Sequence, residues 1–289
     1  MTQPFPSLTV LAAARDGEGD VKTLLDVLGR QLTPGVEVLV ADGGGGAEYP
    51  EWVRSVSLPG ALTPQLWALG LHSVMTSHVA LTTAALQPDE NWVAEAQRAA
   101  ELGAAAVGGA VEPSRHPGVV GWSILFVRYS PNLRPVPAGT QPPGDNAVYR
   151  MDALRRHEAL WSQDFSEPWV HAALLAEGEN LLTAEDLVVT QGNTVRLRHF
   201  SRARFAHGRE YGRKRSQGRR RPHIAADILS TPLVPLLMTV RAARQVMSRR
   251  RLRLRFSLCL PLIMWFYGFW AAGECVGRCD QLRRRADHR

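Results

Sequence analysis

Hydrophobic positions in the first part of the chain form short continuous runs, separated by stretches with a helical repeat. The runs are typical of buried strands. They lie at Leu8–Ala13, Val36–Ala41, Val79–Thr83 and Ala105–Val111, with a possible strand at Val53–Ser57 and a further strand near Leu187–Thr190. Between the first two runs apolar residues recur every three or four positions from Val21 to Leu32, and Thr63 as N-cap followed by Pro64 is typical of a helix start. This alternation predicts an α/β fold with a mostly parallel sheet flanked by helices.

Further along, the pattern predicts three more helices and one long irregular region. The helices are expected at Trp92–Leu102, near Asp152–Leu160 and at Glu167–Glu177. Proline and glycine are frequent from Glu112 to Asn146, so we expect long loops there around the apolar segment Val119–Val127. In open α/β sheets ligands bind beyond the carboxyl ends of the strands. Polar residues that follow strands are therefore the first candidates for a site.

The C-terminal region contains one long apolar run. Phe256–Gly273 is 18 residues without a charge, which as a helix reaches about 27 Å, the short end of what spans a bilayer. Pro261 and the aromatic residues inside the run also fit an in-plane or re-entrant helix, and a buried core helix is a third interpretation. Seven arginines from Arg241 to Arg255 precede the run and favour a cytoplasmic N-terminal flank. The segment Ile224–Val240 is apolar but interrupted by prolines, and we expect it to lie on the membrane surface.

Charge divides the chain in the same way. The 289 residues carry a formal charge of +7, but residues 196–289 hold 23 basic against 5 acidic residues, whereas residues 1–195 hold 11 against 22. With 45% hydrophobic residues and a mean hydropathy of −0.15, the composition indicates a globular protein and argues against many membrane spans. All three cysteines lie in the last 31 residues, which suits a reducing compartment, and the N-terminus has no pattern of a secretory signal. We expect a cytoplasmic body attached to a membrane.

Several common chemistries are absent from the sequence. It has no dinucleotide-binding G-x-G-x-x-G before a helix, no P-loop, no H-E-x-x-H and no G-x-S-x-G. Four other segments occur in a distinctive order, namely Ser7–Gly44, Leu58–Val93, Gly144–Arg150 (GDNAVYR) and Phe165–Leu182 (FSEPWVHAALLAEGENLL). Together they resemble the family 2 glycosyltransferases over about residues 7–215. The resemblance implies a GT-A fold and transfer of a sugar from a nucleotide-diphosphate donor.

The resemblance implies a donor site at the strand ends. Asp42 matches the family's aspartate that contacts the base or ribose of the donor. Ala14, Arg15 and Asp16 match the end of the first strand, which lines the same pocket, and Thr82 and Thr83 follow Val79–Leu81, where the family places its D-x-D. From the residues alone, Asp42 is also a common turn former, so that alternative stays open.

The remaining motifs imply an acceptor site and a base. Asp145 and Asn146 match the family's segment near the acceptor, although an Asx turn before a strand has the same pattern. Glu167 lies 11 residues before Gly178, where the family places its general base, and Ser166 replaces the first acid of the usual Glu-Asp pair. Such a base suits inverting transfer. A carboxylate at a helix N-terminus, followed by Pro168, also stabilises the helix by itself.

The family's metal-binding D-x-D is missing. Thr82, Thr83 and Ala84 stand at its place, and none is a good ligand for Mg²⁺ or Mn²⁺, which prefer carboxylates. Asp89 and Glu90 follow in a turn where a helix-capping role is expected. The sequence therefore predicts no metal site with the usual ligands, and a divalent metal stays open as a cofactor only through other groups.

A basic segment follows the predicted catalytic domain. Its candidates for stabilising the departing diphosphate are His199, Arg202, Arg204, His207 and Arg209, because the family has a basic segment at this place that closes over the donor. A solvated basic helix attracted to anionic lipid has the same composition.

These observations lead to one organisation and two functional hypotheses. We expect a GT-A-like catalytic domain at residues 1–215, a basic interfacial segment at 216–255, and a membrane helix with a basic tail at 256–289. The first hypothesis is a membrane-associated glycosyltransferase that transfers a sugar to a lipid or glycan acceptor, with Glu167 as base. The alternative is a degenerate GT-A domain that serves as a membrane-bound binding scaffold. Anionic lipid is the expected partner of the basic tail, and nucleic acid is not, because stacking aromatic residues do not alternate with the arginines.

Overall fold

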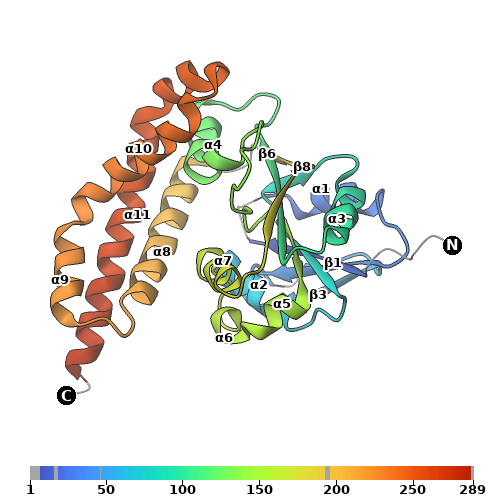
Figure 1. The fold of residues 1–289 in the computed structure, drawn as a ribbon, viewed down its shortest axis with the longest axis horizontal. Helices are drawn as coiled ribbons and strands as arrows, with labels where there is room; N and C mark the ends of the chain where they lie inside the picture. Colours follow the sequence, from blue (N-terminus) through green and yellow to red (C-terminus); the bar gives the residue numbers. More distant parts are fainter. Residues whose placement is uncertain (1–6, 16–18, 46, 193–195, 288–289) are drawn as a thin grey trace. The chain divides into compact units, whose positions relative to one another are not determined.

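A computed structural model describes residues 7–15, 19–45, 47–192 and 196–287 of the chain. The chain forms two compact units (Figure 1). The sheet unit comprises Met1–Ser114 and Asn132–Thr194, and the helical unit comprises Arg115–Pro131 and Val195–Arg289. The helical unit therefore begins earlier than the sequence-predicted boundary after Arg215, and it includes a segment that the sequence analysis assigned to loops of the catalytic domain.

The sheet unit is built on one sheet of eight strands in the order β3-β2-β1-β4-β7-β6-β8-β5. The strands are β1 (Leu8–Ala14), β2 (Val36–Asp42), β3 (Val53–Ser57), β4 (His78–Thr83), β5 (Leu86–Pro88), β6 (Ala106–Glu112), β7 (Ala147–Arg150) and β8 (Leu181–Gln191). Strands β1 to β4 pair in parallel, as do β6 and β8, whereas β7 runs antiparallel to both β4 and β6. The predicted α/β class and the mostly parallel sheet flanked by helices are confirmed.

The helices of this unit begin close to the predicted positions. They are α1 (Val21–Gly29), α2 (Thr63–Leu71), α3 (Trp92–Glu101), α5 (Met151–Arg156), α6 (Glu158–Trp161) and α7 (Glu167–Ala176). Asp20 caps α1 by accepting hydrogen bonds from the backbone N–H groups of Lys22 and Thr23, at 3.0 and 3.3 Å. In α2 the N-cap is Leu62, one residue before the expected Thr63, because the Gln65 side chain accepts a hydrogen bond from the Leu62 N–H at 2.8 Å.

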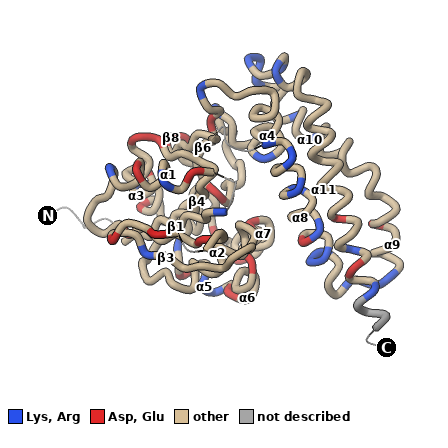
Figure 2. Tube along the Cα trace, turned by 180° about the vertical axis from the view of Figure 1, so that it is seen from behind, with Lys and Arg blue, Asp and Glu red and all other residues tan. Residues whose placement is uncertain are grey.

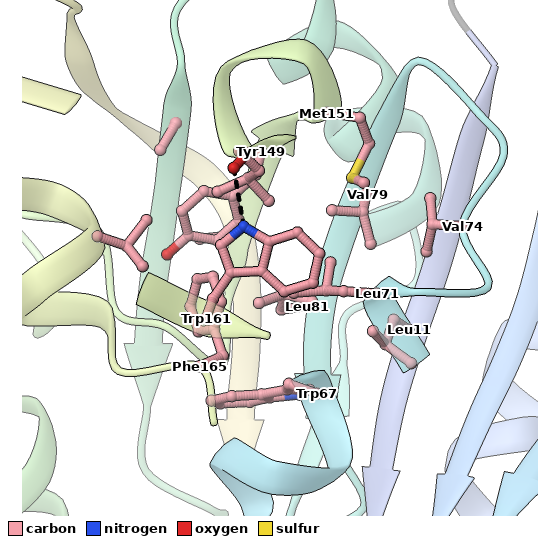
Figure 3. Close-up of a cluster of buried hydrophobic side chains, with 14 of the residues drawn as sticks. Leu11, Trp67, Leu71, Val74, Val79, Leu81, Tyr149, Met151, Trp161 and Phe165 are labelled. Carbon is pink, nitrogen blue, oxygen red and sulfur yellow. Dashed lines mark hydrogen bonds between the residues drawn. The ribbon is translucent and has the colours of Figure 1, made fainter. Parts of the chain in front are cut away.

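A cluster of aromatic and aliphatic side chains fills one side of the sheet (Figure 3). Trp67 and Tyr149 each meet the ring of Phe165 edge to face, with centroids 6.1 and 5.4 Å apart. The indole N–H groups of the two tryptophans in the cluster have partners. Trp67 donates to the Thr82 carbonyl at 3.0 Å, and Trp161 donates to the Leu154 carbonyl at 2.8 Å. Through the Trp67 hydrogen bond to Thr82, the cluster holds the carboxyl end of β4 in place.

The helical unit contains five helices and two short 3₁₀ turns within its described residues. These are α4 (Val119–Tyr129), α8 (Leu197–Arg215), α9 (Arg221–Leu229), η2 (Thr231–Leu233), α10 (Val234–Met247), η3 (Arg250–Leu252) and α11 (Arg253–Asp287), and the turn η1 (Ser130–Asn132) follows α4 at the boundary with the sheet unit. The segment around Val119, expected as an apolar stretch among loops, is thus a full helix. In this unit α11 lies between α8 on one side and α9 and α10 on the other (Figure 1). By length and composition alone, α11 could cross a membrane, and the bent pair of α9 with the segment Thr231–Met247 could form a second span.

Glycines bring α8 and α11 into backbone contact. A Cβ atom added at Gly208 or Gly212 of α8 would lie 2.2 Å from the carbonyl oxygen of Trp270 or Glu274, respectively. On α11 the same atom at Gly273 or Gly277 would lie 2.1 or 1.9 Å from a carbonyl oxygen of α8. Small residues spaced by four allow two helices to approach this closely. The two helices therefore form one tightly packed pair.

A buried ion pair within α11 also contacts α9 and η2 through its arginine. Glu274 and Arg278 are each 3% exposed, and the Arg278 Nη2 lies 2.6 Å from the Glu274 Oε1. The Arg278 Nη1 also donates to the Asp227 carbonyl at 2.6 Å and to the Thr231 hydroxyl at 3.3 Å. Glu274 also lies 3.9 Å from Arg215 of α8, so it links α8 to α11, and its removal would leave the buried Arg278 without an ionic partner.

We expect Glu274→Ala to lower the free energy of unfolding by about 3–5 kcal/mol, the range for a broken buried pair. Arg209→Ala is the matched control, because its ion pair with Asp280 also joins α8 to α11 but is half exposed. The control should cost at most about 1 kcal/mol. Urea denaturation followed by circular dichroism measures both values, and equal losses would contradict the buried pair's role.

Candidate functional site

The predicted donor-site residues lie together at one edge of the sheet. In the parallel register Ala14 of β1 lies opposite Asp42 of β2, and Thr83 of β4 lies opposite Ala13 of β1. Arg15 follows directly and donates from Nε to the Ala61 carbonyl at 3.0 Å. Asp16, the other candidate at the end of β1, lies outside the described residues. The carboxyl ends of three adjacent strands therefore present these groups side by side.

Asp42 is a buried carboxylate that also organises its own turn. It is 6% exposed, and its Oδ1 accepts a hydrogen bond from the Gly44 N–H at 2.8 Å. The Tyr49 hydroxyl is buried nearby, and burial followed by the negative charge of Asp42 raises the pKa of Tyr49 to about 12. The turn-forming contact is thus real, but it uses one carboxylate oxygen. Tyr49 was not identified from the sequence, because it lies in a loop that carries no regular pattern.

Thr82 and Thr83 end β4 with buried hydroxyl groups. They are 0% and 6% exposed, and neither Oγ1 has a hydrogen-bond partner among the residues that the structure describes. A buried hydroxyl without a partner costs free energy. A ligand bound at this sheet edge would offset that cost by supplying a partner.

A second group of acidic residues lies at the same edge because of the direction of β7. Leu81, just before Thr82, is opposite Ala147, the first residue of the antiparallel β7. Asp145 therefore enters the sheet where β4 ends, and its side chain is 3% exposed. Both predicted parts of the site thus meet at one edge, although β4 ends at Thr83 and β7 begins only at Ala147.

Glu167 lies directly over Gly144. A Cβ atom added at Gly144 would lie 2.0 Å from the Glu167 Oε2, so only glycine leaves room for the carboxylate. Glu167 is half-buried and is the first residue of α7, where the helix dipole favours a negative charge. Burial, followed by the negative charges of Glu167 and Asp145, raises the pKa of Tyr149.

Tyr149 and His171 form a neutral pair beneath these carboxylates. The Tyr149 hydroxyl lies 2.8 Å from the His171 Nε2, and burial lowers the pKa of His171 to about 4. The imidazole is therefore neutral at pH 7. Neither residue was a sequence candidate, although His171 follows Glu167 by one helical turn and so shares its helix face.

No protein-family model and no curated protein sequence matches the chain. Among solved structures, it is similar to the mannosyltransferase PcManGT from Pyrobaculum calidifontis, solved in complex with GDP-Man and Mn2+, with a TM-score of 0.54 and 14% identity over 98% of this chain and 92% of that one. S. aureus TarS 1-349 in complex with UDP matches with a TM-score of 0.49 and 14% identity over 97% and 92%. The chain has a GT-A fold. At 14% identity these similarities show the fold alone, and the activity has to be inferred from the site.

Within this GT-A fold, Asn146 has a structural role. Its Oδ1 accepts a hydrogen bond from the Trp92 Nε1 at 2.9 Å, and its Nδ2 donates to the Ala110 and Leu187 carbonyls, both at 2.9 Å. Both amide hydrogens are therefore engaged in hydrogen bonds to strands β6 and β8. The predicted contact of Asn146 with an acceptor therefore has to rely on the remaining lone pair of Oδ1.

Among the described residues, the GT-A strand ends hold no carboxylate cluster that could bind a metal. No group of three or more His, Cys, Asp or Glu residues that could hold a metal ion occurs among the described residues. Asp89 is engaged locally, since its Oδ1 accepts a hydrogen bond from the Glu90 N–H at 2.9 Å. The hydroxyl groups of Thr82 and Thr83 are poor substitutes for the missing acids. The residues present thus do not fit the metal site that D-x-D would form.

The basic candidates after the GT-A sheet belong to α8 of the helical unit. Arg204 packs over the ring of Trp270 at 4.2 Å, and burial lowers its pKa to about 10. Arg209 pairs with Asp280 at 2.7 Å. Both side chains thus hold α8 against α11, which differs from the predicted diphosphate role. His199 and His207 are half-buried on the same helix, and Arg202 is exposed.

We expect Asn146→Ala to lower the free energy of unfolding by at least about 3 kcal/mol, because the Trp92 N–H and two carbonyls would lose their partner. Asn91→Ala is the control, since Asn91 is exposed at the start of α3 and its side chain makes no cap hydrogen bond. Urea denaturation measures both. A stability loss no larger than that of the control would show that the buried amide is dispensable.

Proposed function

We propose that this protein is a glycosyltransferase that moves a sugar from a nucleotide-diphosphate donor to a glycan or lipid acceptor close to a membrane. The observation that carries the proposal is the meeting of two sets of groups at one sheet edge of a GT-A fold. Asp42, Thr82 and Thr83 come from the carboxyl ends of parallel strands, and Asp145 and Glu167 come from the start of β7 and of α7.

The donor would bind at the first of these sets. The similar mannosyltransferase was solved with GDP-Man, which supports a nucleotide-sugar site in this fold. Asp42 keeps one carboxylate oxygen for the base or ribose, with Ala14 and Arg15 beside it, and the two threonine hydroxyls would find partners on the donor. Asp16 is also proposed to line the donor site, and for this residue only the sequence supports the role.

Glu167 would act as the general base. Its carboxylate takes the proton of the acceptor hydroxyl as that oxygen forms a bond to the sugar C1, while the bond from C1 to the diphosphate oxygen breaks and the electron pair leaves with the nucleotide diphosphate. The configuration at C1 is inverted. Gly144 leaves space for the carboxylate, and the neutral Tyr149–His171 pair adds no positive charge that would lower its basicity.

Glu167→Gln should lower turnover by about 10²- to 10⁴-fold, the usual contribution of a general base, and leave donor affinity unchanged. Initial rates of transfer and titration calorimetry with the donor separate the two effects. Gly144→Ala should act in the same direction, since its Cβ would displace the carboxylate, whereas Gly118→Ala meets open space and is the control. Full turnover in Glu167→Gln would refute the base.

Catalysis is expected to persist when divalent ions are removed. The D-x-D acids are absent, and in their place we propose that His199, Arg202 and His207 of the basic segment stabilise the departing diphosphate. Transfer assays in EDTA should retain most of the activity measured with added Mg²⁺ or Mn²⁺. A loss of activity that Mn²⁺ restores would contradict this prediction, and the similar mannosyltransferase, solved with Mn2+, is the reference for that outcome.

The second candidate is a scaffold that binds nucleotide sugars at the membrane without turnover. The loss of D-x-D and of half of the acidic pair favours it. Donor binding by calorimetry with no transfer or hydrolysis of any nucleotide sugar would support the scaffold, and turnover of any donor would exclude it. In both cases we expect the sheet unit to lie on the cytoplasmic side.

A further inference from the structure

The helical unit carries an extended apolar surface, here termed the α10–α11 face. Its members are exposed hydrophobic side chains of α9, η2, α10 and α11, with exposed fractions from 38% to 82%. They are Leu229, Leu233, Leu236, Leu237, Val240, Leu254, Leu258, Trp265 and Val276. A soluble surface seldom exposes so many large apolar groups on neighbouring helices, and such groups mark a site of interaction.

On α11 these residues form one stripe. Leu254, Leu258, Trp265 and Val276 are separated by steps of three and four residues added together, so they share a helix face. The exposed Pro261 and Ala272 lie on the same face. The stripe runs for about 33 Å along the helix at 1.5 Å per residue. The other faces of α11 are buried against α4 and α8, as at Phe256 and Phe266.

Positive charge borders this face. The helical unit holds 25 basic and 5 acidic residues, and the sheet unit holds 9 and 22, a contrast that is visible in Figure 2. Near the turn from α10 to α11, Arg241, Arg244 and Arg250 are exposed. An apolar face with arginines at its border matches the headgroup region of an anionic bilayer, and Trp265 is a residue type that prefers that depth.

The position of α8 decides how α11 can meet a membrane. Trp265, near the middle of the uncharged run, donates from Nε1 to the Ser201 hydroxyl of α8 at 3.1 Å. The next residue, Arg202, is exposed, and α8 carries seven basic residues along the length of its contact with α11. If α11 crossed a bilayer, Arg202 would lie near its centre, at a cost of at least about 2.5–3.5 kcal/mol for this side chain alone.

We propose that the helical unit lies in the plane of an anionic membrane, with the α10–α11 face in the headgroup region and no segment crossing the bilayer. This inference rests on the membrane location in the proposed function and specifies its geometry. Both ends of the chain then lie on the same side of the membrane. The acceptor would be reached from the surface, as for a lipid-linked sugar or a glycan held there.

Flotation of the full chain with lipid vesicles tests the occupant of the face. We expect binding to vesicles of phosphatidylcholine with phosphatidylglycerol, weaker binding to phosphatidylcholine alone, and a decrease with added salt. The double variant Leu236→Glu and Leu237→Glu should bind at least about tenfold less, because two apolar contacts are replaced by charges that anionic lipid repels. Leu102→Glu is the matched control, an exposed leucine of the sheet unit that should change nothing.

Two results would overturn the proposed occupant. Equal binding of the double variant and the control would show that the α10–α11 face does not contact the membrane. A dimer in light scattering that the double variant abolishes, with no flotation, would assign the face to a second copy of the chain.

The orientation has its own test. The full chain is expressed in bacterial cells with an epitope tag at each end, and protease is added to intact spheroplasts and to lysed ones. Both tags should respond alike, and alkaline carbonate should release the protein from the membrane. Cleavage of only one tag in intact spheroplasts would show a crossing and overturn the proposal. Neither test measures sugar transfer, so a failure here leaves the Glu167→Gln result to judge the proposed function separately.

Discussion

The antiparallel entry of β7 into the middle of the sheet is the constraint on which the candidate site depends. β7 lies between β4 and β6, with Ala147 opposite both Leu81 and Gly108. The segment before it must therefore arrive at the edge where the parallel strands end. Asn146 holds this arrival in place, because its amide joins Trp92, Ala110 and Leu187. Without that direction and that anchor, Asp145 and Glu167 would lie away from Asp42.

The order of strands and helices was predictable from the sequence because each element has its own local hydrophobic pattern. Apolar runs of five to seven residues identified β1, β2, β4 and β6, β3 was a possible strand, and the helical repeats between them identified α1, α2 and α3. The parallel arrangement then followed from the alternation of the two. The resemblance to family 2 glycosyltransferases added the candidate residues, and the register of β1, β2 and β4 brings Ala14, Asp42 and Thr83 to one edge.

Other features depend on contacts that no local pattern encodes. The amide of Asn146 reaches partners 36 to 54 residues away, so its sequence context suggested a turn or an acceptor contact and not a junction between strands. Arg204 was expected to meet phosphate, but its guanidinium packs on the distant Trp270 ring. The helix α4 was hidden because it is embedded between proline-rich loops and packs against residues more than 100 positions later, as between Phe126 and Phe256. Fold was thus more predictable than the use of individual polar side chains.

The glycine contacts between α8 and α11 have a mechanical consequence. With carbonyl oxygens against Gly208, Gly212, Gly273 and Gly277, neither helix can slide along the other without a clash of backbones. Any change in how deeply α11 settles among lipid headgroups must therefore carry α8 with it.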